Sequence, residues 1–169
     1  GYASTTNDAE MHAFLWDGVV IRDLGTLGGR YSLGHAINAS GQVTGSAGLA
    51  SDVERHAFLW DGSAMRDLGA LGGTLSNGNA VNDSGQVTGE AYTINNGASH
   101  AFLWDGSSMK DLSLGSFGAT YSTGMAINAA GQVTGLAYIN DFDQHAFLWD
   151  GTTTLDLSLI HISEPTRRR

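Results

Sequence analysis

Four histidines and eight aspartates recur at fixed places in this sequence, and they are the first residues to weigh for chemistry. Each histidine begins a copy of the stretch "HAFLWDG", and the copies start at His12, His56, His100 and His145. Imidazole and carboxylate groups are common zinc ligands and common general acids and bases. Equivalent positions in successive repeats should lie about one repeat width apart, too far to share one ion. We therefore expect packed or hydrogen-bonded structural histidines and no metal site.

The aspartates also follow the repeat. One set lies in turns and the other precedes a leucine, and we interpret both as turn-forming and loop-bonding residues: Asp17, Asp61, Asp105 and Asp150, and Asp23, Asp67, Asp111 and Asp156. An acid–base pair would need a carboxylate placed differently from the rest. "LGG" lacks the lysine and the helix of a phosphate loop, and no Ser/His/Asp constellation is present. The sequence predicts no catalytic residues and no cofactor, so we expect a protein that is not an enzyme. For a longer protein the question stays open.

Tyrosines are the remaining candidates for a binding site. All four tryptophans lie in the repeated stretch, whereas the five tyrosines lie in or beside segments that differ between copies, such as "GGRYSLG" and "YTINNGAS". We expect these segments to be loops at one rim, where binding residues usually lie on a uniform scaffold. Tyr, Asn and Asp can bind sugars by ring stacking and hydrogen bonds. The predicted ligand-binding residues are Tyr31, Tyr92, Asn95, Tyr121, Tyr138, Asp141 and Asp143. The alternative is that they are solvated residues without a ligand. "NDFDQ" (140–144) has ligands that suit calcium but lacks a recognised calcium-loop spacing.

The elements that position these residues repeat every 44 or 45 residues, and such a period decides the fold. One unit, residues 34–69, holds four strand-like runs: "GHAIN", "QVTGSA", "HAFLW" and "AMRDL". "NASG" suits a type I turn and "DG" predicts a two-residue hairpin loop. Four strands joined in this way form a small antiparallel meander, the blade of a β-propeller. "HAFLW" is apolar on both faces, so each blade must be covered on both sides. The predicted repeat core is therefore Phe14, Trp16, Phe58, Trp60, Phe102, Trp104, Phe147 and Trp149.

We thus predict an all-β chain, a β-propeller fragment of about three and a half four-stranded antiparallel blades. The expected boundaries are a partial blade at 1–25 and blades at about 33–69, 77–113 and 123–157. A β-solenoid is the alternative, since it also stacks repeats. Because the chain begins in the middle of a repeat, we expect missing repeats of the same chain to be partners of this fragment.

Composition excludes several classes of partner. The formal net charge is −9, which argues against binding nucleic acid or an anionic membrane surface, since both need a basic patch. No stretch approaches the roughly 18 consecutive apolar residues of a membrane helix, so we expect no membrane insertion. The chain has no cysteine, and thus no disulfide.

The repeats resemble the HAF repeat family of probable extracellular repeat proteins. The resemblance rests on "HAFLWDG", "RDLGTLGG" (22–29) and "AIN.SGQVTG" (36–45), and it covers about residues 1–159. It implies a secreted or cell-envelope bacterial protein with a propeller-like fold, and no catalytic residues. The last residues, 160–169, break the repeat and resemble a translated sequencing adapter. We interpret them as an artefactual tail on a metagenomic fragment, with a genuine basic tail as the alternative.

Three functions fit these observations. The first is a non-catalytic extracellular binding scaffold that presents variable loops to a glycan or protein partner. The second is an accessory or propeller module of a larger extracellular enzyme, and the third is a purely structural surface protein.

Overall fold

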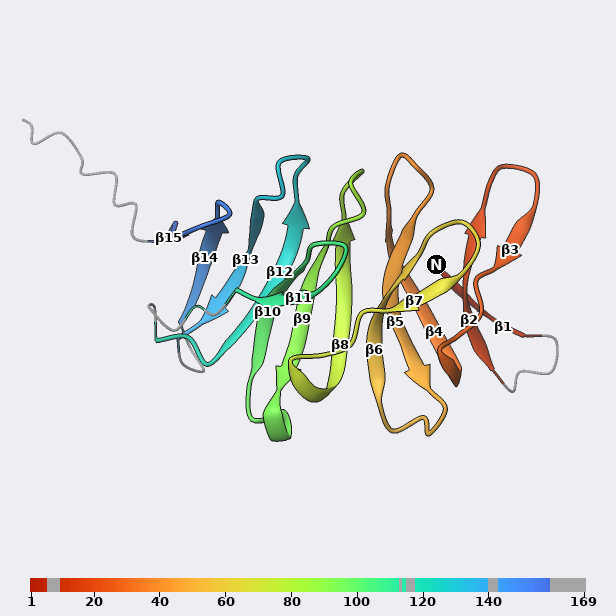
Figure 1. Ribbon diagram of the computed structural model, residues 1–169, viewed down its shortest axis with the longest axis horizontal. Helices are drawn as coiled ribbons and strands as arrows, with labels where there is room; N and C mark the ends of the chain where they lie inside the picture. Colours follow the sequence, from red (N-terminus) through yellow and green to blue (C-terminus); the bar gives the residue numbers. More distant parts are fainter. Residues whose placement is uncertain (6–9, 113, 115–117, 140–142, 159–169) are drawn as a thin grey trace, which may run out of the picture.

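The chain folds almost entirely into β-strands. The structure, a computed structural model, describes residues 1–5, 10–112, 114, 118–139 and 143–158, so the predicted tail at 160–169 lies outside the described residues. Figure 1 shows the strands side by side along the long axis of the molecule. In chain order they are β1 (Tyr2–Ser4), β2 (Met11–Trp16), β3 (Ile21–Asp23), β4 (Gly28–Ile37), β5 (Val43–Leu49), β6 (Arg55–Trp60), β7 (Met65–Asp67), β8 (Gly72–Val81), β9 (Val87–Thr93), β10 (Ser99–Trp104), β11 (Met109–Asp111), β12 (Tyr121–Ile127), β13 (Val133–Tyr138), β14 (Gln144–Trp149) and β15 (Thr154–Asp156).

The strands form three four-stranded antiparallel meanders and one partial one. The meanders are β4–β7, β8–β11 and β12–β15, preceded by β1–β3. Successive repeats are joined by single parallel bridges between the third strand of one and the first strand of the next, as at Arg55 and Leu75. The predicted antiparallel blade is confirmed. A parallel β-solenoid is excluded because the pairing within each repeat is antiparallel.

The first strand of each blade is longer than predicted. We expected "GGRYSLG" and "GGTLSNG" to be connecting loops, but β4 begins at Gly28 and β8 at Gly72, so both segments lie within strands. Each strand changes register against its neighbour twice, which accommodates the glycines and small polar residues that made these segments look like loops.

The core lies between the blades. Between the second and third repeats, Ala57, Leu59 and Leu68 of one blade pack against Phe102 and Trp104 of the next. Equivalent residues form the clusters on either side. The two inner "HAFLW" strands, β6 and β10, thus pack against both neighbouring blades, with Ala and Leu on one face and Phe and Trp on the other. Trp16 is an exception: it is 62% exposed, because no described blade precedes it, and Phe14 is only partly buried.

A basic side chain from each blade covers the tryptophan of the next. The guanidinium of Arg66 lies 4.9 Å from the ring centre of Trp104. Arg22 and Trp60, at 5.8 Å, and Lys110 and Trp149, at 4.7 Å, repeat this cation–π contact. Three of the five basic residues before the tail therefore have one shared structural role.

The turn after each tryptophan differs from the prediction by one residue. In the second copy, Trp60 pairs with Met65 and the Asp61 N–H donates to the Ala64 carbonyl. The two central residues are therefore Gly62 and Ser63, with Gly62 at a φ of 107°. That is glycine at the first central position, as in a type II′ turn, rather than Asp-Gly. The aspartate instead accepts the backbone N–H groups of Ser63 and Ala64.

These turn aspartates predict a loss of stability in acid. Backbone N–H donors, with a serine hydroxyl, lower the pKa of Asp61 to about 2 and that of Asp105 to about 2, from 3.8. Because the folded pKa is depressed, the stabilisation is present above pH 3.8 and is lost as the pH falls toward about 2. We expect the melting temperature to fall over that window, and to fall less in the double variant Asp61→Asn/Asp105→Asn. Parallel curves for both proteins would contradict this assignment.

Candidate binding site

The repeated histidines have a structural partner. Each Nδ1 donates to the carboxylate of the aspartate that ends the fourth strand, at 2.8, 2.9, 2.9 and 2.7 Å for His12, His56, His100 and His145. In the first two copies, that carboxylate also accepts the N–H of a glycine two residues later. The pair therefore ties the third strand of a blade to the segment after its fourth strand. Among the described residues, no group of three or more His, Asp or Glu side chains is placed to hold a metal ion.

Residues that differ between copies gather at one level of the blades. Register pairs link Met11 to Tyr31, Gly48 to Arg55 to Leu75, and Tyr92 to Ser99 to Tyr121 to Tyr138. We call these nine residues the variable row. Residues such as Ala57 and Phe58, a few positions along the same strands, are identical in every copy. Constant residues therefore lie close to a level at which the side chains differ between copies.

The tyrosine recess is the part of the row where aromatic residues converge. Tyr92, Tyr121 and Tyr138 line a recess of about 180 Å³, together with Glu90 and Ser99. The Ser99 hydroxyl oxygen is buried without a hydrogen-bond partner among the described residues, whereas the Glu90 carboxylate accepts the Asn77 amide at 3.0 Å. Aromatic faces, hydroxyls and a carboxylate thus surround one small space.

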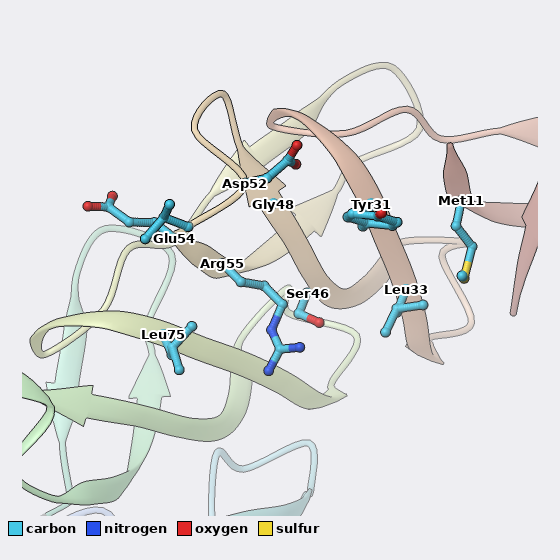
Figure 2. A pocket seen from close by; sticks show the side chains of 10 residues that line it. Met11, Tyr31, Leu33, Ser46, Gly48, Asp52, Glu54, Arg55 and Leu75 are labelled. Carbon is cyan, nitrogen blue, oxygen red and sulfur yellow. The ribbon is translucent and has the colours of Figure 1, made fainter. Parts of the chain in front are cut away.

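The arginine pocket lies one repeat earlier in the chain. It encloses about 390 Å³ and is lined by Tyr31, Ser46, Gly48, Arg55 and Leu75, among others. Three of these stand 44 residues before members of the tyrosine recess: Ser46 before Glu90, Gly48 before Tyr92, and Arg55 before Ser99. The two sites therefore occupy equivalent places in successive blades with different side chains. Figure 2 shows Arg55 reaching across the pocket between Leu75 and Ser46.

The structure brings together only some of the predicted binding residues. Tyr92, Tyr121 and Tyr138 meet in the tyrosine recess, and Tyr31 lines the arginine pocket. We expected these four tyrosines in loops, but all four lie in strands. Asn95 lies in the short 3₁₀ turn η1 (Ile94–Asn96) with a φ of 60°, and Asp143 is exposed next to β14. Neither of these two lines the tyrosine recess or the arginine pocket, and Asp141 lies outside the described residues.

Sequence reasoning missed Ser46, Arg55, Glu90 and Ser99. Ser46 and Glu90 belong to strands that were predicted as part of the repeated scaffold. Arg55 and Ser99 end segments that were predicted as variable loops, in which only Tyr, Asn and Asp were predicted to bind a ligand. The signal was nevertheless present, because each differs from its counterpart in the other copies. A comparison of the copies position by position, strands included, would have found them.

No helix among the described residues is long and apolar enough to span a membrane.

Comparisons with known proteins identify the architecture. No protein-family model matches the chain, and no curated protein matches it in sequence. The β-propeller domain of the Trilobed protease from Pyrococcus furiosus superposes with a TM-score of 0.57 at 14% identity, covering 87% of this chain and 45% of that one. Acylaminoacyl peptidase from Pyrococcus horikoshii superposes with a TM-score of 0.56 at 15% identity, covering 88% of this chain and 23% of that one. The chain thus spans less than half the length of either structure. At these identities the likeness concerns the fold alone, and the fold is that of a β-propeller.

Proposed function

We propose that this propeller module is a non-catalytic binding scaffold of an extracellular or cell-envelope protein, and that its tyrosine recess binds a glycan. The observation that carries the proposal is the convergence of three tyrosines from β9, β12 and β13 on one recess. The repeat itself does not require tyrosine there, since the matching positions of other copies hold Gly48 and Leu75. The HAF-type motifs support the extracellular setting by resemblance.

The chemistry of the recess suits a neutral sugar ring. A pyranose presents a face of C–H groups that packs on an aromatic ring, and its hydroxyls both donate and accept hydrogen bonds. The Glu90 carboxylate accepts such bonds, and the Ser99 hydroxyl can do both. The net charge of −9 disfavours an acidic glycan. A recess of about 180 Å³ has room for a single sugar ring but not for the surface of a protein partner. We therefore expect the ligand to place one sugar unit in it.

The test is binding of neutral oligosaccharides to the 169-residue chain. Calorimetry with β-linked and α-linked glucose, N-acetylglucosamine and xylose hexamers should identify at least one ligand. Tyr92→Ala and Tyr138→Ala are each expected to weaken that binding about tenfold or more, with the melting temperature little changed.

Tyr2→Ala is the matched control, because Tyr2 is an exposed tyrosine on β1 that does not line the recess. It should leave the affinity unchanged. If no oligosaccharide binds while a protein partner is lost in the two recess variants, the scaffold binds a protein. If both recess variants bind a glycan as the parent does, the recess is not its site.

A second candidate is the propeller module of a larger enzyme. Both solved structures described above carry the names of peptidases, although the likeness to them extends only to the propeller fold. Extending the reading frame of the source DNA tests this candidate directly. A neighbouring domain with a catalytic constellation would favour it, and further repeats alone would favour the binding scaffold.

A further inference from the structure

Two basic residues that do not cover a tryptophan between blades lie in or next to the arginine pocket. Five basic residues precede the tail, and Arg22, Arg66 and Lys110 cover tryptophans between blades. Of the other two, Arg55 lines this pocket, and Arg30 is paired with Asp52, which also lines it. The counterparts of Arg30 and Arg55 in the next copy are Thr74 and Ser99, so the scaffold does not demand a positive charge at either position.

Arg55 is the one of these two whose charge is available to a ligand. Arg30 is engaged, since its Nε lies 2.7 Å from Asp52 and its guanidinium stacks near the Tyr31 ring. The Arg30 backbone and side-chain donors hold the pKa of Asp52 below its usual value. Within the described part of the chain, no ion pair joins Arg55 to another residue. Figure 2 shows the Glu54 carboxylate directed away from the Arg55 guanidinium.

A buried hydroxyl without a partner lies in the same pocket. Ser46 is only 1% exposed, and its Oγ has no hydrogen-bond partner among the described residues. Leaving a buried polar group unsatisfied typically costs about 1–3 kcal/mol. Ser46 and Arg55 come from the neighbouring strands β5 and β6, and both line the pocket. A ligand with acceptor oxygens would satisfy both groups at once.

The rest of the pocket is mainly apolar. Met11, Leu33, Val53 and Leu75 line it together with the Tyr31 ring. Two carboxylates also line it: Asp52 is paired with Arg30, and Glu54 points away from the Arg55 guanidinium (Figure 2). Its volume of about 390 Å³ lies within the range of roughly 300–1,000 Å³ typical of small-molecule sites. Mainly apolar walls with one unpaired guanidinium and one unpaired hydroxyl match a carboxylate attached to an apolar group. A uronic acid matches less well, because most of these walls cannot hydrogen-bond to its ring hydroxyls.

We propose that the arginine pocket is a binding site for an apolar carboxylate, either a small organic acid or the carboxyl end of a peptide. Arg55 binds the carboxylate with charge-assisted hydrogen bonds, and Ser46 donates to one of its oxygens. The aliphatic part lies against Leu33 and Leu75. This site is distinct from the tyrosine recess and does not depend on glycan binding there.

Calorimetry on the 169-residue chain at low salt tests the proposal with four probes. These are 4-methylpentanoate, the tripeptide Gly-Gly-Leu, and the amide of each. The carboxylates should bind, and each amide should bind at least about tenfold more weakly than its acid. Binding of both carboxylates supports a small acid as sufficient ligand, and binding of the tripeptide alone supports a peptide end. Equal binding of acid and amide, equal binding of glucuronate, or no binding of any probe would each overturn the proposal.

Three variants locate the site. Arg55→Gln should weaken carboxylate binding about tenfold or more, whereas Arg66→Gln, which removes the same charge outside the pocket, should change it less than about twofold. Ser46→Ala should weaken binding while leaving the melting temperature unchanged or raised, because it removes an unsatisfied buried hydroxyl. A purely structural Ser46 would not separate these two readouts. Tyr138→Ala should leave carboxylate binding intact, which keeps this result separable from the fate of the glycan proposal.

Discussion

Trp104→Ala should lower the free energy of unfolding of the 169-residue chain by about 3–5 kcal/mol, the usual range for removing a large buried aromatic side chain. Trp104 is only 6% exposed and packs with Phe102 against Ala57, Leu59 and Leu68 of the preceding blade. The substitution also removes the ring beneath Arg66. Because each blade contacts only its neighbours, the loss falls on one interface between blades. Urea unfolding followed by circular dichroism measures it.

Trp16→Ala is the matched control, since Trp16 holds the same place in the first copy of "HAFLWDG". It is 62% exposed, and its replacement should cost about 1 kcal/mol or less. The comparison separates the effect of the blade interface from the intrinsic preference of tryptophan for a strand. Equal losses at both positions would show that packing between blades is not what the motif provides.

Much of the fold could be predicted because every copy of the repeat contains a strand with apolar residues on both faces. Ala57 and Leu59 on one face of a strand and Phe58 and Trp60 on the other require cover on both sides, and blades stacked face to face provide it. The turn aspartates and the histidines make the hydrogen bonds expected of structural residues, and these bonds recur from copy to copy.

The errors arose where backbone geometry, not side-chain pattern, decides the structure. Gly28 and Gly72 looked like connector residues, yet each begins a strand that changes register to accommodate small residues. The turn after Trp60 was placed one residue early because Asp61 was counted as a central residue. Positive φ at glycine and local register shifts leave little trace in hydrophobic periodicity.

The candidate site was predicted only in part for a related reason. Tyr92, Tyr121 and Tyr138 stood out as residue types, but their convergence depends on the parallel bridge between Ser99 and Tyr121. No feature of the sequence predicts that parallel bridge. Ser46 was missed because it lies in a predicted strand, and Arg55 because only Tyr, Asn and Asp of the predicted variable loops were expected to bind a ligand. In a repeat protein the constant residues report the fold, and the strand positions that vary without altering the fold are the ones to test for ligands.

Gly89→Ala is expected to be the most damaging of the small substitutions, because its Cβ would have no space. A methyl group at Gly89 would fall far inside contact distance of the Asn77 carbonyl oxygen, which is backbone and cannot swing away. Gly89 lies opposite Gly78, beside a register shift in β8. Overpacking in a tight core usually costs about 1–3 kcal/mol, and a clash with main chain should reach about 3 kcal/mol or more.

The same clash recurs at Gly45 with Leu33 and at Gly135 with Thr123, so three independent substitutions should give the same loss of stability. Gly97→Ala is the control, since the nearest atom to its Cβ is the Ile94 carbonyl oxygen at 3.5 Å and its φ is −71°. It should change the unfolding free energy by about 0.5 kcal/mol or less. Gly89→Ala should also weaken glycan binding, because opening β8 from β9 displaces Asn77 from Glu90, which lines the tyrosine recess. If Gly89→Ala lowered the free energy of unfolding no more than Gly97→Ala does, β8 and β9 would not approach each other as closely as the position of the recess requires.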